Sequence, residues 1–173
     1  AMELFEKDER YRNFHLDGQT IVLDDYLEIR PENREKLKKY VQEGRFHVGP
    51  WYILQDEFLT SGEAAVRNLL TGMREAKEFG GLCPVGYFPD AFGNAGQMPQ
   101  LLKQAGMKAV AFGRGVKPVG FNNEAKEGGA YESTYSEMNW ESMDGSGLLG
   151  ILFANWYNNG AEIPVEPEEA KEY

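Results

Sequence analysis

An aspartate in a turn rich in aromatic residues and glycine is the residue of this chain best placed for chemistry. Asp90 follows an apolar run over residues 85–88, and Phe92 and Gly93 come soon after it. In α/β proteins, groups just beyond the carboxyl end of a strand face the ligand crevice. Asp90 is therefore the first candidate for chemistry, although an aspartate in such a turn can also cap the helix that follows.

Polar and aromatic side chains also follow the other predicted strands. The carboxyl ends of parallel strands meet at one rim. Carboxylates, one arginine and flat aromatic rings on one rim indicate a sugar site, because the rings pack on the C–H face of a pyranose while charged groups hold its hydroxyls. Whether Trp51 and Trp156 contact a sugar or belong to the core remains open, because tryptophan is more often a buried core residue. The residues at this predicted rim are Asp17, Trp51, Tyr52, Asp56, Glu57, Asp90, Phe92, Arg114, Trp156 and Tyr157.

Ordinary glycoside hydrolysis needs two carboxylates, one that attacks the sugar or activates water and one that protonates the leaving oxygen. Asp90 fits the nucleophile role by position. Asp56 and Glu57 are candidates for the acid, but the start of a loop that braces the rim is the commoner role for such a pair. Arg114 stands between two glycines without a P-loop signature, so we expect it to orient a nearby carboxylate.

Alternating strands and helices must position these residues. Strands are predicted over 13–16, 45–48, 85–88 and 109–112, with helices between them. Strand–helix units of roughly 30 residues predict parallel βαβ construction and an α/β fold. A loop is predicted over 118–134, and 137–141 with 148–153 is predicted to form a hairpin around Asp144 and Gly145.

The helix after the second of these strands has a defined start and face. Thr60 and Glu63 are predicted to form a capping box at its first turn. Its core face is predicted from apolar residues at helical spacing, which are Val66, Leu69, Leu70 and Met73.

Composition limits the class of protein. With 173 residues and 42% hydrophobic content the chain can bury a real core, and its net charge of −10 argues against a nucleic-acid partner. The single cysteine, Cys83, rules out an internal disulfide and a cysteine-based zinc site. No apolar run of ~20 residues predicts a membrane span and no secretory signal opens the chain, so we expect a cytoplasmic protein. His15 and His47 lie in apolar strand patterns and are expected to be core or surface residues rather than metal ligands.

These motifs resemble the amino-terminal catalytic domain of glycoside hydrolase family 38, the α-mannosidases, in the manner of its bacterial branch. The segments that carry the resemblance follow one another in order through nearly the whole chain, and the most specific is 86–94. They are 16–19, 31–33, 49–52, 61–63 with 66–70, 86–94 with 96–97, 112–115, Trp140 with 144–146, and 154–157.

The resemblance implies a partial (β/α) barrel of the family's (β/α)7 type, taken from a retaining exo-α-mannosidase that uses one zinc ion. It implies that Asp90 is both the nucleophile and a zinc ligand, with Arg114 beside it. Tyr157 matches the family's aromatic residue after the hairpin, and Trp156 is its neighbour. With Phe92 and Asp56, these residues make up the predicted substrate-binding set. The expected substrate is a mannose-containing glycan, with an α-1,3 linkage as the first choice.

This chain also departs from the family pattern. The family's His-x-Asp zinc pair has no match here, and the general acid and the last zinc histidine are expected downstream of residue 173. We therefore expect 1–173 to be a fragment of a single catalytic domain that is metal-free and inactive by itself. Its parts are strand–helix repeats over 12–116, a loop and hairpin over 117–160, and a truncated tail over 161–173.

Two further expectations concern what the chain binds. Missing strands would expose sheet edges, which favours a homo-oligomer. The alternative function is a non-catalytic carbohydrate-binding module that uses the same aromatic rings and carboxylates.

Overall fold

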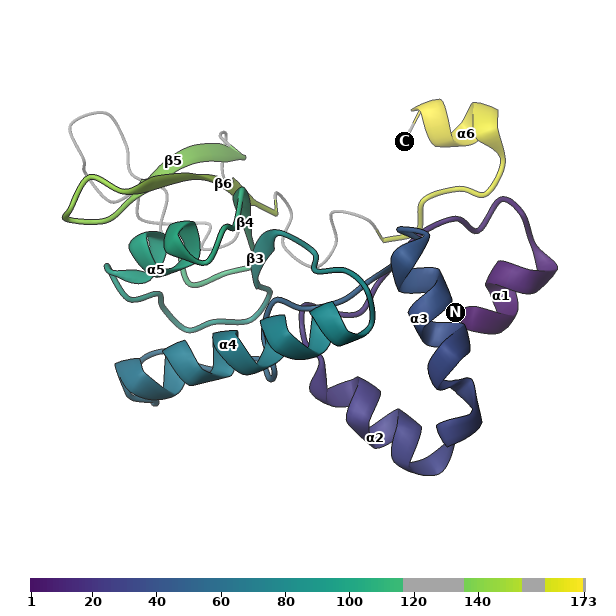
Figure 1. Ribbon diagram of the computed structural model, residues 1–173. Coiled ribbons are helices and arrows are strands. Elements are labelled where there is room, and N and C mark those ends of the chain that lie inside the picture. The colour runs from purple at the N-terminus through teal and green to yellow at the C-terminus, as the bar shows by residue number, and fades with distance from the viewer. Residues whose placement is uncertain (117–135, 154–160, 173) are drawn as a thin grey trace.

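The structure is a computed structural model that describes residues 1–116, 136–153 and 161–172 (Figure 1). The loop predicted over 118–134 lies outside these ranges, as do Trp156 and Tyr157, two of the predicted site residues. Within the described ranges, no helix is both long and apolar enough to cross a membrane.

Strands alternate with helical segments from the start of the described chain to residue 112, as the apolar pattern predicts. The helices are α1 (Met2–Lys7), α2 (Ile21–Ile29), the 3-10 turn η1 (Pro31–Asn33), α3 (Arg34–Gln42), α4 (Gly62–Glu78), α5 (Met98–Gln104) and α6 (Pro167–Glu172). The strands are β1 (Phe14–His15), β2 (Phe46–His47), β3 (Val85–Phe88), β4 (Ala109–Phe112), β5 (Glu137–Glu141) and β6 (Gly147–Leu152).

The described strands form two sheets. β1 and β2 pair in parallel, and a second sheet has the order β3-β4-β6-β5. In this second sheet β3, β4 and β6 are parallel, while β5 runs antiparallel to β6. An α/β fold with parallel strands and the hairpin around Asp144 and Gly145 are thereby confirmed. Closure of these strands into part of a barrel stays a prediction.

Two clusters of buried side chains hold the elements together. Figure 1 shows β3, β4, β5 and β6 with α4 and α5 on one side of the molecule, and α1, α2 and α3 on the other. The first cluster joins α4 and α5 to the four-stranded sheet, and its members include Trp51, Leu69, Phe88, Met98, Leu102, Phe112 and Leu152. The second joins α1, α2 and α3 to β2, and its members include Phe5, Leu23, Leu37, Tyr40, Phe46 and Phe79. Each such side chain contributes roughly 1.5–3 kcal/mol on burial.

The start of α4 differs from the predicted capping box. Ser61, not Thr60, is the N-cap: its backbone is extended, and its hydroxyl accepts a hydrogen bond from the Ala64 N–H at 3.2 Å. The Thr60 hydroxyl instead faces the preceding loop, where it lies 3.2 Å from Gln55 Oε1. The prediction of Thr60 with Glu63 was therefore wrong by one residue, because the loop uses the threonine hydroxyl.

Helix α4 also holds the loop that follows β2. The Asn68 side chain accepts from the Ile53 N–H at 2.9 Å and donates to the Ile53 carbonyl at 2.7 Å. Gly72 lies directly against the backbone of Trp51, where any Cβ would clash. Leu69 is buried as predicted, but Leu70 is 59% exposed and does not belong to the core face. The loop over 51–59 is thus fastened to α4 through Asn68 and Gly72.

Candidate active site

Strand register brings Asp90 and Arg114 together. Phe88 of β3 pairs with Phe112 of β4, and each of the two charged residues lies two positions beyond its strand. Asp90 and Arg114 form an ion pair through Oδ1 and Nη2, with side-chain exposures of 57% and 21%. Parallel neighbouring strands place equivalent positions side by side, so this pair follows from the topology.

The turns that carry the two residues are packed against each other at close range. Gly113 faces the Pro89 carbonyl and Gly115, with φ +81°, faces the Ala91 carbonyl, so that a Cβ at either position would clash with backbone. The Gly113 N–H donates to the Phe88 carbonyl at 2.9 Å, and the Asn94 side chain donates to the Gly115 carbonyl at 3.2 Å. Glycine is required at these two positions for the arginine to reach the aspartate.

A cavity of about 240 Å³ lies beside this pair, and it brings a second carboxylate next to Asp90. Asp56 reaches it from the loop after β2, which α4 holds in place. The residues that line the cavity are Trp51, Leu54, Gln55, Asp56, Tyr87, Phe88, Pro89, Asp90 and Ala91. A larger cavity of about 480 Å³ lies between α1, α2 and the two-stranded sheet, and no predicted site residue lines it.

Phe92 supports the arginine. The Arg114 guanidinium carbon lies 4.3 Å from the centroid of the Phe92 ring, a cation–π geometry, and Phe92 is 70% exposed. The structure therefore places the predicted site residues Asp90, Arg114, Asp56 and Phe92 in one region.

Trp51 is a core residue. It is 1% exposed, its ring centroid lies 5.4 Å from that of Phe88, and its indole N–H donates to the Tyr87 carbonyl at 3.0 Å. Of the two interpretations left open for Trp51, burial is the one observed. A buried indole N–H needs a partner, and here the partner is the backbone of the strand that leads to Asp90.

Glu57 is a buried carboxyl next to the site. It is 8% exposed, and its Oε2 accepts a hydrogen bond from the Ala95 N–H at 2.5 Å. Burial raises the pKa of Glu57 from its usual value of 4.5 to about 7, against the lowering effect of the Ala95 hydrogen bond. The sequence pattern does not distinguish Glu57 from Asp56, because burial depends on where the distant 94–95 backbone lies.

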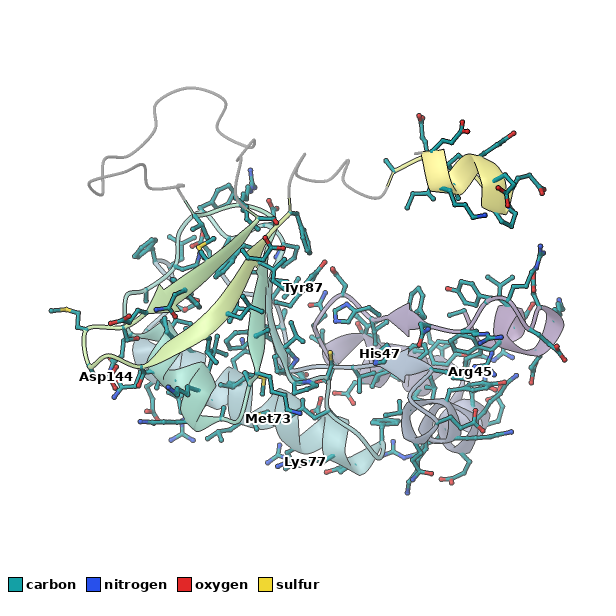
Figure 2. The ribbon with its side chains drawn as sticks, turned by 90° about the horizontal axis from the view of Figure 1, so that it is seen from above. Arg45, His47, Met73, Lys77, Tyr87 and Asp144 are labelled. Atoms are coloured by element: carbon teal, nitrogen blue, oxygen red, sulfur yellow. The ribbon has the colours of Figure 1, made fainter. Side chains whose placement is uncertain are left out.

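The two histidines lie on neighbouring strands, and His15 contacts the second sheet. His15 and His47 are paired across β1 and β2, and the His15 ring contacts the Tyr87 ring at 5.0 Å between centroids. Figure 2 shows His47 and Tyr87 on adjoining parts of the molecule. Burial is the main cause that lowers the pKa of His15, with the nearby His47 adding to it.

The part of the chain that the structure describes does not by itself provide a zinc site. No group of three or more His, Cys, Asp or Glu side chains in it is arranged to hold a metal ion. Zinc sites in proteins use three or four protein ligands, and Asp90 would supply one oxygen ligand while also contacting Arg114. The described residues alone therefore do not fit the ion.

Comparison with known proteins gives the family. The sequence model described as "Glycosyl hydrolases family 38 N-terminal domain" matches residues 1–172. The chain belongs to glycoside hydrolase family 38. The resemblance carried by segments such as 86–94 is therefore confirmed.

Individual relatives are similar to this family 38 chain in sequence, and one of them is also similar in structure. The "Putative mannosylglycerate hydrolase" of Halalkalibacterium halodurans is 56% identical over 99% of this chain and 19% of its own length. The "Alpha-mannosidase G" of Dictyostelium discoideum is 32% identical over 77% of this chain and 12% of its own. An alpha-mannosidase of Enterococcus faecalis V583 has a solved structure with a TM-score of 0.83 and 52% identity, covering 99% of this chain and 18% of that one. The chain thus spans about a fifth or less of the length of these relatives.

Proposed function

We propose that the protein to which this chain belongs is a retaining exo-α-mannosidase that hydrolyses terminal α-linked mannose. The observation that carries the proposal is Asp90 at the end of β3, half exposed, paired with Arg114 and bordering a cavity that also contains Asp56. Membership of glycoside hydrolase family 38 supports this chemistry, since relatives are named as α-mannosidases.

In this mechanism Asp90 acts as the nucleophile. A carboxylate oxygen bonds to C1 of the mannose as the glycosidic C1–O bond breaks, and the leaving oxygen takes a proton from an acid outside the described residues. Water then attacks C1 and gives its proton to the conjugate base of that same acid, which releases mannose with its configuration retained and restores both Asp90 and the acid. Arg114 orients the Asp90 carboxylate, and Asp56 is placed to accept hydrogen bonds from sugar hydroxyls.

The remaining expectations belong to the same proposal. The chain is a section of a (β/α)7-type barrel in a cytoplasmic enzyme, and 1–173 alone is inactive. The zinc ion that the family implies would bind the complete domain, with Asp90 as one ligand and the others outside the described residues. Trp156 and Tyr157, also outside them, are proposed to contact the sugar.

Two candidate substrates of the full-length protein follow from this proposal. The relative at 56% identity is named as a mannosylglycerate hydrolase, which favours an α-mannoside with a small anionic aglycone. An α-1,3-linked mannose disaccharide represents the glycan substrate expected from the bacterial branch. The kcat/KM values of the full-length protein for the two compounds decide between them.

The nucleophile is identified by covalent trapping. The full-length protein is treated with a 2-fluoro-mannosyl fluoride, digested, and the labelled peptide is sequenced by mass spectrometry. Label on Asp90 is the expected result, and label on another peptide contradicts the assignment. Saturable mannoside binding without any hydrolysis, in the same full-length protein, would instead support a carbohydrate-binding module.

A further inference from the structure

The loop over 51–59 contacts the far end of the Asp90 turn. Glu57 Oε2 accepts from the Ala95 N–H at 2.5 Å, and the Phe58 ring occupies the space where a side chain at Gly93 would lie. Residues 91–95 belong to no helix or strand. Their conformation therefore depends on such contacts rather than on a regular backbone ladder.

The two ends of the Asp90 turn are held by different elements. At its start, Pro89 follows β3 and lies against Gly113. At its end, the Ala95 N–H donates a hydrogen bond to Glu57. Glu57 belongs to the loop over 51–59, which Asn68 attaches to α4. Asp90 lies between these two attachments, so the position of its carboxylate depends on both.

Glu57 is positioned to accept the Ala95 hydrogen bond and not to contact a ligand in the cavity. It is 8% exposed and does not line the cavity beside Asp90, whereas its neighbour Asp56 does. Its Oε1 is also buried and has no hydrogen-bond partner among the described residues. Burying a carboxyl group with one accepted bond costs stability, since desolvation of a charge or polar group is only partly offset. The raised pKa of Glu57 reflects the same cost.

We propose that Glu57 is a positioning residue for Asp90, which sets the location of the nucleophile by holding the Ala95 end of its turn. This inference rests on the proposed function of Asp90. Glu57 touches neither the sugar nor the reacting atoms. Displacement of a reacting group by about 1 Å can lower a rate by roughly 100-fold, so loss of this contact is expected to act on kcat.

The test uses the full-length protein and two substitutions of Glu57. One shortens the side chain, and the other removes its charge at the same length. Glu57→Asp keeps the carboxylate but is one methylene shorter, and Glu57→Gln keeps an acceptor oxygen at full reach. We expect Glu57→Asp to lower kcat on an aryl α-mannoside by about 10- to 100-fold with KM within about twofold. Glu57→Gln should retain kcat within about fivefold, because its amide oxygen still accepts from Ala95.

Glu75 provides a matched control. It is also a carboxyl group with a pKa raised by burial, and it accepts a hydrogen bond from the Thr20 hydroxyl at 2.5 Å. Glu75 lies on α4 and Thr20 is the N-cap of α2, so this hydrogen bond does not involve the Asp90 turn. Glu75→Asp and Glu75→Gln should therefore lower the melting temperature without a selective change in kcat.

A structural readout keeps this inference separate from the proposed function. Amide hydrogen exchange of peptides covering 88–97 should be faster in Glu57→Asp than in the wild type, and unchanged in Glu75→Asp. Equal protection in both Glu57 variants and the wild type, or a kcat loss in Glu57→Asp no larger than in Glu75→Asp, overturns the positioning role. If the wild-type protein hydrolyses no α-mannoside, the proposed function fails, and the exchange data still decide whether Glu57 holds the turn.

Discussion

Arg114 contacts Asp90 through an ion pair and at the same time lies over the Phe92 ring, with 4.3 Å between the guanidinium carbon and the ring centroid. Both contacts use the planar guanidinium group, which is attracted to carboxylates and aromatic faces alike. The aromatic ring and the carboxylate come from the same turn after β3. Arg114 therefore joins two parts of that turn from the neighbouring strand.

Replacing Arg114 by lysine tests this arrangement. Arg114→Lys keeps the positive charge but loses the planar group, so we expect kcat/KM for an aryl α-mannoside to fall by about 10- to 100-fold. The control is Arg67→Lys on α4, an exposed arginine paired with Glu63. It should stay within about twofold of the wild type, since exposed ion pairs contribute little. Full activity of Arg114→Lys would show that charge alone suffices.

Close packing of the two turns predicts a strong effect of a single methyl group. In Gly113→Ala the new Cβ would clash with the Pro89 carbonyl, a backbone atom that cannot move without displacing Asp90. We expect a loss of about 2 kcal/mol or more in the free energy of unfolding, together with reduced kcat. Urea unfolding and steady-state kinetics of the full-length protein measure the two effects.

The control for this substitution is Gly62→Ala. Gly62 is the first residue of α4, and no atom lies within 4 Å of a Cβ placed there. Alanine should leave stability unchanged or raise it slightly, because it restricts the unfolded chain. A Gly113→Ala protein as stable as Gly62→Ala would contradict the packing described for 89 and 113.

The general plan of the site could be predicted from sequence because it follows from strand order. Asp90 and Arg114 each stand just beyond a short apolar strand, and parallel pairing of those strands is enough to bring them together. Asp56 was predicted at the same rim for the same reason, and the structure places it beside the same cavity. Local sequence pattern and one rule of topology are enough to bring these residues to one rim.

Burial and hydrogen-bond partners could not be predicted in the same way. Whether Trp51 stacks on a sugar or packs in the core depends on Phe88 and Tyr87, more than 30 residues away in sequence. Glu57 and Asp56 are adjacent acids, yet one is buried on Ala95 and the other faces the cavity. Local pattern does not separate such neighbours, because long-range packing decides which way each side chain points.

Trp51 gives a prediction about stability. Trp51→Phe leaves the Tyr87 carbonyl without its indole donor and removes part of a fully buried ring. We expect the free energy of unfolding to fall by about 2–4 kcal/mol, from the lost hydrogen bond and the cavity together. KM for an aryl α-mannoside should stay within about threefold, measured at a temperature where the variant is folded. A large rise in KM with unchanged stability would show instead that Trp51 contacts the sugar.

Glu57 predicts how stability depends on pH. Its pKa of about 7 in the folded protein exceeds its usual value of 4.5, so between these pH values the folded state binds more protons than the unfolded state. The protonated Glu57 carboxyl contributes fully to the free energy of unfolding below about pH 4.5. This contribution is lost as the pH rises through about 7. The loss amounts to about 3 kcal/mol in the free energy of unfolding.

The variant Glu57→Gln lacks this titration. Its melting temperature relative to the wild type should therefore rise between pH 5 and pH 8, as the wild-type carboxyl loses its proton in a buried position. Glu63→Gln, at an exposed residue on the first turn of α4, serves as the control for the loss of a carboxyl group outside the buried site. Parallel melting curves for Glu57→Gln and the wild type at all pH values would mean that the Glu57 carboxyl is as well solvated in the folded protein as in the unfolded chain. That result would contradict its burial against Ala95.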